Sequence, residues 1–168
     1  AQTPSPVASQ PASTADWRET RAYHLGIQAV IYGYPAVKNL TTRYYMVARP
    51  SGIVDTPTNN WYHTRRATDA TDKYHSSVTA DLLYSAGWFD LREQPIVLTV
   101  PEDFGQYYSI QLMEMYSDIF GYIGTRQTGG KAGNYLLVGP DWNETLPADA
   151  RFDGIIRSPT PTGMMLLR

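Results

Sequence analysis

The chain has 168 residues, enough for one domain with a sizeable buried core. Its 14 Lys and Arg against 16 Asp and Glu give a net charge of -2, which provides no basic surface of the kind that binds nucleic acid. It has no Cys, which excludes disulfides, thiolate metal sites and a Cys nucleophile. No apolar run approaches the ~18 residues that a membrane span needs.

The first 15 residues are rich in Ala, Pro, Ser, Thr and Gln and contain no charged side chain. This composition is typical of a flexible leader, and the small residues at the start fit the product of signal-peptide removal. We therefore expect residues 1–15 to be a leader and the protein to be periplasmic or extracellular. An artificial chain boundary is the alternative explanation.

Residues 16–49 have the spacing of helices, because apolar side chains recur at intervals of three and four. Asp16, with Glu19 three residues later, is suited to cap the first helix. Pro35 lacks a backbone donor and crowds the preceding turn, which predicts a break or a kink of the helix at Tyr34. We expect a pair of helices, the second starting at Ala36, packed on the domain that follows.

The polar stretch 53–76 contains two histidines, His63 and His75, which flank Asp69 and Asp72. These four side chains are of the types that ligate metals, but their spacing matches no known metal motif. We therefore expect no metal and no cofactor.

From residue 77 the apolar period changes to two, which is typical of strands, and Gly and Pro separate the segments. The predicted strands cover residues 77–80, 82–90, 96–100, 107–116, 120–124, 134–138, 154–158 and 164–167. Many short strands at close spacing predict a sandwich. The expected fold class is α+β, mostly β: a helical pair packed on an antiparallel β-sandwich of residues 50–168, of the immunoglobulin-like class.

Five segments occur in an order that is similar to one bacterial family. They are VTADLLYSAGWFDL at 78–91, VPEDFGQYYSIQLMEMYSDIF at 100–120, GTRQTGGKAGNYLLVGPDW at 124–142, LPADAR at 146–151 and RSPTPTGMMLLR at 157–168. Together they resemble the family called "domain of unknown function 1254", and the likeness runs from about Trp17 to Arg168. Family members carry an Asn-Asn-Asp-Thr run before Leu-Tyr, of which only Asp81 is present here.

The resemblance implies a fold more strongly than an activity. It implies an exported protein of two β-sandwich domains, in which this domain is followed by a companion called "domain of unknown function 1214". A companion sandwich domain or a second copy of the chain is therefore the expected partner.

Glu114 is the most conspicuous candidate for chemistry. The alternation of its predicted strand places it on the same face as Ile110 and Leu112. A carboxylate on an apolar face is costly unless it is paired or protonated, so Glu114 is a candidate acid/base or ligand group. The structural alternatives are an ion pair with Arg126 or Arg157, or exposure at the strand end.

Tyr84 and Trp88 are four residues apart on a predicted strand, so their rings face the same way. Such an aromatic platform suits a glycan or another flat small molecule, although the edge of a sandwich core has the same pattern. The candidate site residues are Glu114 and Asp81 for catalysis, and Tyr84, Trp88, Tyr108 and Arg126 for ligand binding.

Three functional hypotheses follow. The chain has 13 Tyr and 4 Trp against 4 Phe, and Tyr-rich sheet surfaces suit contact with another molecule. The first hypothesis is an exported module that binds a partner domain, a polymer or its own copies. The second is a hydrolase-type enzyme on a small molecule or glycan, with Glu114 as acid/base. The third is a subunit of an extracellular assembly, built by strand exchange.

Overall fold

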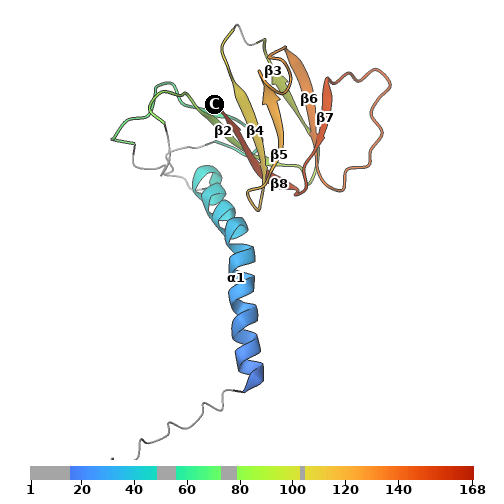
Figure 1. The fold of residues 1–168 in the computed structure, drawn as a ribbon. Helices are drawn as coiled ribbons and strands as arrows, with labels where there is room; N and C mark the ends of the chain where they lie inside the picture. Colours follow the sequence, from blue (N-terminus) through green and yellow to red (C-terminus); the bar gives the residue numbers. More distant parts are fainter. Residues whose placement is uncertain (1–15, 49–55, 73–78, 103–104) are drawn as a thin grey trace, which may run out of the picture. The chain divides into compact units, whose positions relative to one another are not determined.

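The computed structural model describes residues 16–48, 56–72, 79–102 and 105–168, so the expected leader lies outside the described residues. The chain divides into two compact units, Ala1–Tyr34 and Pro35–Arg168, and each is described on its own. Figure 1 shows one helix, α1, and the strands of the second unit.

Helix α1 runs over Trp17–Arg43 and is followed by a short π-helical turn, Tyr44–Ala48. Asp16 caps its start as predicted, because the Arg18 N–H donates to Asp16 Oδ1 at 3.0 Å. The predicted break at Pro35 is wrong, and so is the helical pair. Proline has a φ that suits a helix and removes only one of its hydrogen bonds, so the helix continues through this position. No helix within the described residues is long and apolar enough to cross a membrane.

Five strands form the larger sheet, and all of its pairs are antiparallel. In sheet order they are β1 (Tyr62–His63), β2 (Ser85–Asp90), β8 (Thr162–Leu167), β4 (Ser109–Glu114) and β5 (Ile119–Gly124). Strand β8, which follows the others in the sequence, therefore lies in the middle of the sheet.

The smaller sheet has the order β3 (Ile96–Val100), β6 (Gly133–Val138) and β7 (Gly154–Arg157). Strands β3 and β6 are antiparallel, but β6 and β7 are parallel, which corrects the expectation of a wholly antiparallel sandwich. A parallel connection has to bring the chain from the end of one strand back to the level where that strand began. The segment 139–153 between β6 and β7 is long enough to do so.

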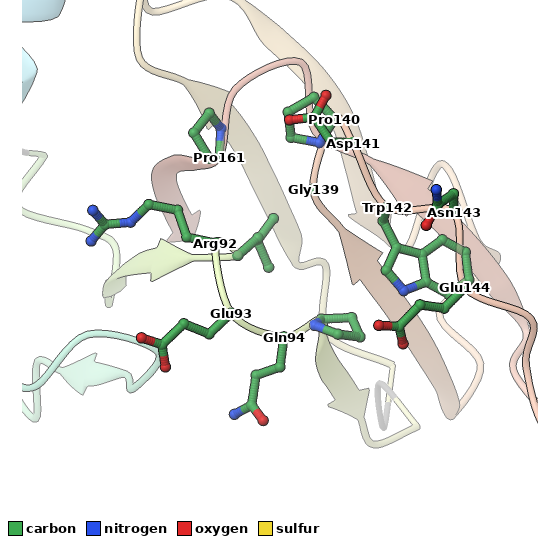
Figure 2. Close-up of a pocket in the computed structure, with 12 residues that line it drawn as sticks. Arg92, Glu93, Gln94, Gly139, Pro140, Asp141, Trp142, Asn143, Glu144 and Pro161 are labelled. Carbon is green, nitrogen blue, oxygen red and sulfur yellow. The ribbon is translucent and has the colours of Figure 1, made fainter.

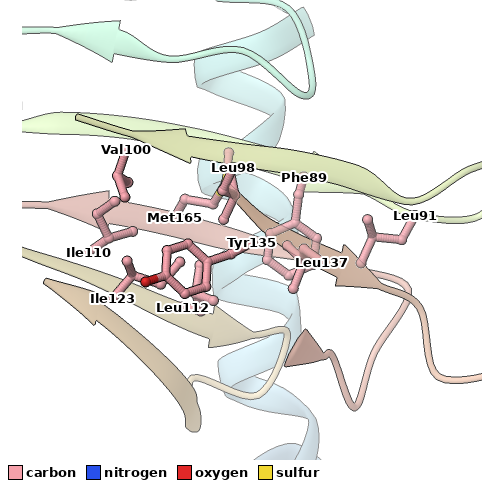
Figure 3. Close-up of a cluster of buried hydrophobic side chains, with 10 residues drawn as sticks. All are labelled: Phe89, Leu91, Leu98, Val100, Ile110, Leu112, Ile123, Tyr135, Leu137 and Met165. Carbon is pink, nitrogen blue, oxygen red and sulfur yellow. The ribbon is translucent and has the colours of Figure 1, made fainter. Parts of the chain in front are cut away.

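The two sheets share one hydrophobic core, shown in Figure 3. The larger sheet contributes Phe89 and Leu112, which are both fully buried, and the smaller sheet contributes Leu137, which is also fully buried. A mostly β fold of the α+β class is therefore confirmed, with two sheets facing each other. The immunoglobulin-like subclass stays a prediction.

Most strand positions agree with the sequence, and the exceptions are local. Thr79 and Ala80, the described part of the strand predicted at 77–80, are not in a strand. The strand predicted at 82–90 begins only at Ser85. Strand β1 was not predicted, because two residues are too short to show a period.

The end of the helical segment packs on the larger sheet within the second unit. Asn39 Nδ2 donates to Met115 O and to Ser117 Oγ, both at 2.9 Å. Trp88 Nε1 lies 3.3 Å from the sulfur of Met46. Arg43 forms an ion pair with Asp90, which lies at the end of β2. These contacts fix residues 39–46 to the outer face of this sheet.

Candidate functional site

A largely apolar cavity lies at one end of the sandwich, where β2 begins and β3 ends. We call it the Ser85 pocket, and its volume is about 360 Å³. Its lining residues are Trp61, His63, Ser85, Leu98, Thr99, Val100, Pro101, Glu102, Tyr108, Ile110 and Leu167. The pocket continues the apolar space between the two sheets, because Leu98, Val100 and Ile110 also belong to the core.

A polar pair, the buried Ser85 and the exposed His63, lies in the lining of this pocket. His63 and Ser85 are partners in the register of β1 and β2, and His63 Nδ1 lies 2.6 Å from Ser85 Oγ. The neighbouring Thr64 N–H donates to Tyr84 O at 2.8 Å, so 63 and 85 form a pair without backbone hydrogen bonds to each other. In such a pair the side chains lie closest together, which explains the short contact.

Gly87 allows this arrangement because the chain before β1 passes very close to β2. A Cβ at Gly87 would lie only 2.5 Å from the backbone oxygen of Asn60, and backbone cannot move aside cheaply. Glycine at position 87 therefore lets Trp61 and His63 approach β2 and close one side of the Ser85 pocket.

A second cavity, of about 340 Å³, lies at the opposite end of the strands, and we call it the loop pocket. Figure 2 shows it between the loop that follows β2, residues 92–94, and the loop that follows β6, residues 139–144. Its lining is mixed, and the charged side chains in it are Arg92, Glu93, Asp141 and Glu144. Carboxylates and an arginine on two exposed loops are also what an ordinary solvated surface presents.

Arg157 holds the second of these loops in place. Its Nη1 donates to the backbone oxygens of Gly139, Pro140 and Trp142, at 3.0, 2.9 and 2.8 Å. Its guanidinium also lies 6.0 Å from the centre of the Trp142 ring. The guanidinium of Arg157 therefore binds backbone oxygens of the loop at residues 139–142, and it forms no ion pair with Glu114.

Glu114 is buried, as its strand pattern predicts, with 6% of its surface exposed. Its Oε1 accepts hydrogen bonds from the backbone N–H groups of Tyr116 and Asp118, at 2.7 and 3.0 Å. These bonds close the turn between β4 and β5, where Ser117 has a φ of 75°. The burial of the carboxylate thus has a structural explanation that differs from the ion pair and from the exposure expected from the sequence. A role as acid/base stays a prediction.

Tyr84 and Trp88 do not form an open aromatic platform. Trp88 is 2% exposed, and its indole N–H points to Met46. The hydroxyl of Tyr84 accepts a hydrogen bond from the Thr79 backbone N–H and lies 2.9 Å from Thr79 Oγ1. The hydrogen bonds from Thr79 lower the pKa of Tyr84, and the charge of Arg168 adds to the effect.

The other predicted site residues are spread over the domain. Tyr108 lines the Ser85 pocket. Arg126 is exposed in the connection between β5 and β6, and Asp81 is exposed in a turn before β2. Glu114 ends β4, whereas Tyr108 precedes the start of the same strand. The structure therefore does not bring Glu114 together with the predicted ligand-binding residues.

Asp90 is the centre of a charged cluster beside the loop pocket. Its carboxylate accepts hydrogen bonds from Arg92 Nε at 2.9 Å and from Arg43 Nη2 at 3.1 Å. Hydrogen bonding from Arg92 lowers the pKa of Asp90, and the charges of Arg92 and Arg43 add to the shift. Asn59, at a φ of 63°, completes the cluster through its amide, which binds the backbone N–H and O of Asp90.

No group of three or more His, Asp or Glu side chains in the described residues is arranged to hold a metal ion. Arg66 engages two of the side chains considered above, lying 2.7 Å from Asp72 Oδ1 and 3.2 Å from Asp69 Oδ2. His63 faces Ser85 instead, and His75 lies outside the described residues.

Sequence reasoning missed the pair of His63 and Ser85. His63 was considered only as a metal ligand, and Ser85 was not considered. The useful signal was the order Trp61-Tyr62-His63, which places His63 and Trp61 on the same face if the segment is extended. The partner strand was not readable from the sequence.

These observations define a mostly β domain with two facing sheets and an N-terminal helix, in which the Ser85 pocket and the loop pocket lie at the ends of strands. Residues 58–168, which contain both sheets and both cavities, match the family described as "Protein of unknown function (DUF1254)". The chain belongs to this family, which confirms the resemblance seen in the sequence.

One solved structure similar to this chain is the crystal structure of the VPA0106 protein from Vibrio parahaemolyticus. The two chains are 23% identical, with a TM-score of 0.64 over 83% of this chain, so the likeness shows the fold alone. This chain corresponds to only 31% of the length of that protein. No curated protein matches the chain.

Proposed function

We propose that the chain is a protein-binding module whose helical residues 17–34 dock against an apolar surface of a partner domain. The observation that carries this proposal is the exposure of large apolar side chains along this part of α1. Asp16 and the helix are the only described residues of their unit, so nothing described within that unit covers these side chains. A large exposed apolar patch commonly marks a site of interaction.

The apolar residues form a continuous stripe. Tyr23, Ile27, Val30 and Tyr34 follow each other at intervals of four, three and four, which places them on one side of a helix. Their exposed fractions are 68%, 42%, 68% and 65%. This spacing is that of the contact positions in packed helices.

A second stripe, of small residues, runs directly beside the first. Ala22, Gly26, Ala29 and Gly33 have the same intervals, each one position before a member of the large stripe. No atom lies within 4 Å of the place that a Cβ would take at Gly26 or at Gly33. Small residues allow another backbone to approach closely, and large residues beside them fill its grooves. The two stripes together suit docking better than either alone.

Energetics also favour a partner. Most helical stability in proteins comes from packing of an apolar face. Gly26 and Gly33 weaken the helix by about 1 kcal/mol each relative to Ala. Full burial of a side chain such as Ile27 or Val30 contributes roughly 1.5–3 kcal/mol. Docking thus supplies the stability that the isolated helix lacks.

The length comparison supports a partner domain over the other occupants. The Vibrio parahaemolyticus protein of the same fold is about three times as long as its matched part, since the match spans 31% of it. The present domain therefore occurs elsewhere beside a large amount of further protein. A second copy of the chain and a polymer are the other occupants that an experiment has to separate.

Hydrogen exchange and dye binding test the proposal on residues 1–168. We expect amides of residues 17–34 to exchange rapidly in dilute protein, and an apolar dye to bind. Ile27→Asp removes dye binding, whereas Gln28→Asp, the same charge one position away on α1, leaves it unchanged. Protection that rises with concentration identifies a second copy as the occupant. Strong protection in a dilute monomer that binds no dye would sink the proposal.

The composition of residues 1–15 supports a periplasmic or extracellular location for this module. Fractionation of cells that produce the protein from its natural gene tests the location, and recovery in the cytoplasm alone contradicts it. The hydrolase alternative has no comparable support, because the carboxylate of Glu114 is engaged in the β4–β5 turn.

A further inference from the structure

We propose that the Ser85 pocket binds a small neutral molecule with an apolar body and one hydroxyl group, such as an alkylphenol. The pocket is separate from the docking helix, so this proposal stands or falls independently of the proposed function.

The walls of the pocket select an apolar body. Leu98, Val100 and Ile110 reach it from both sheets, and each is at most 5% exposed. Trp61 and Tyr108 add two aromatic rings. The volume of about 360 Å³ is at the lower end of the roughly 300–1,000 Å³ typical of small-molecule sites. A single substituted ring therefore suits the space.

The polar pair gives the pocket a place where a ligand can form a hydrogen bond. Ser85 is 8% exposed, and its hydroxyl can both donate and accept. If it donates to His63 Nδ1, its oxygen still accepts from a ligand; with the other tautomer, its proton is available to a ligand. A ligand hydroxyl, which also donates and accepts, is satisfied in either state.

The same pair is not well placed to act as a nucleophile and base. Ser85 lies in a strand with neighbours on both sides, β1 through His63 and β8 through Leu167. Its backbone N–H is directed into the sheet and is not presented to a bound carbonyl. Stabilisation of an oxyanion by such donors is usually the largest catalytic contribution in acyl transfer. Binding therefore fits the geometry better than hydrolysis.

The charges around the pocket favour a neutral ligand. Glu102 lies on its rim, and no Lys or Arg is among its described lining residues. A ligand carboxylate would be repelled by Glu102 and would meet no permanent cation. A hydroxyl brings the hydrogen bond without the charge. The class of ligand is thus fixed by three features: apolar walls, one Ser–His pair and a rim carboxylate.

Calorimetric titration with three matched probes tests this choice. We expect 4-propylphenol to bind, propylbenzene to bind about fivefold more weakly because it lacks the hydroxyl, and 4-propylbenzoate to bind at least tenfold more weakly. Ser85→Ala lowers the affinity for 4-propylphenol about fivefold and leaves propylbenzene unchanged. Ser85→Thr retains the hydroxyl and therefore keeps the preference for 4-propylphenol over propylbenzene. His24→Ala, on the helix, is the control and changes nothing.

Ser85→Leu places a bulky side chain in the pocket and abolishes binding of all three probes, and thermal unfolding shows whether this variant is folded. If Ser85→Leu does not fold, the site is located by NMR of the wild type instead. We expect 4-propylphenol to shift the amide signals of residues 61–63 and 98–100. The proposal is overturned if no probe binds at about 1 mM, if propylbenzene binds as well as 4-propylphenol, if 4-propylbenzoate binds best, or if the shifted amides lie elsewhere.

Discussion

Arg43 and Asp90 lie 47 positions apart in the chain, and Arg43 Nη2 donates to Asp90 Oδ2 at 3.1 Å. Only 22% of the Arg43 side chain and 17% of the Asp90 side chain are exposed. The pair therefore ties the end of α1 to the end of β2 in a setting where water screens it only partly.

Asp90→Asn is expected to reduce the free energy of unfolding by about 1–3 kcal/mol at neutral pH, because it weakens hydrogen bonds to two arginines. The pKa of Asp90 is lower in the folded protein than its ordinary value. Its contribution is therefore complete above the unfolded pKa of about 3.9 and is lost as pH falls through the lower folded pKa.

Urea unfolding of wild type and Asp90→Asn between pH 7 and pH 2 measures this dependence. The two curves converge at acid pH. The exposed Asp149→Asn serves as control and shifts stability by less than about 0.5 kcal/mol. A difference between wild type and Asp90→Asn that stays constant down to pH 2 would contradict the assignment.

Glu114→Ala is expected to cost about 1–3 kcal/mol, because the N–H groups of Tyr116 and Asp118 lose their charged acceptor. Glu114→Gln keeps an acceptor oxygen and costs less. Chemical unfolding gives both values, with the exposed Glu93→Ala as control. Wild-type stability in Glu114→Ala would show that the turn does not need this side chain.

Gly163→Ala is expected to destabilise the domain by more than about 2 kcal/mol, since a Cβ there would overlap Met113 O and the ring of Phe89. Gly26→Ala is the matched opposite case. It lies in open helix with nothing within 4 Å, and should gain about 1 kcal/mol in helix stability. Thermal unfolding reports the first change and helical circular dichroism the second. Equal tolerance at both positions would contradict the packing at Gly163.

Tyr84 is expected to titrate below the usual pKa of about 10, because Thr79 hydrogen bonds favour its phenolate. Thr79→Val removes the hydroxyl but keeps the backbone N–H, so the pKa rises only part of the way. Titration of ¹³C-labelled tyrosine by NMR measures it, with Thr41→Val on the helix as control. An unchanged Tyr84 pKa in Thr79→Val would refute the role of this hydroxyl.

The apolar patterns of the sequence predicted a strand well where Gly or Pro lies at both of its ends. Strand β3 was predicted residue for residue, because a run of β-branched and leucine side chains lies between Pro95 and Pro101. The parallel pairing of β6 and β7 was not predictable, since a strand's own residues do not state its partner. The break predicted at Pro35 was wrong because the loss of one hydrogen bond does not outweigh the remaining bonds of a long helix.

The candidate site shows the same limit. His63 and Ser85 are 22 residues apart, and only the pairing of β1 with β2 joins them. The burial of Glu114 was predicted from the alternation of apolar and polar residues along its strand. Its hydrogen bonds from Tyr116 and Asp118 were not predicted, because they depend on the geometry of the β4–β5 turn. Tyrosines were expected on sheet surfaces, and Tyr122 on β5 is exposed there, but Tyr23, Tyr32 and Tyr34 lie exposed on the helix as well.

The central position of β8 has a consequence for biosynthesis. A ribosome makes β1, β2, β4 and β5 first, and these can form only two separate pairs until residues 162–167 emerge and join them. During that interval β2 and β4 each present an unpaired edge, which is the situation that favours aggregation. The larger sheet can therefore close only when residues 162–167 are available to pair with both β2 and β4.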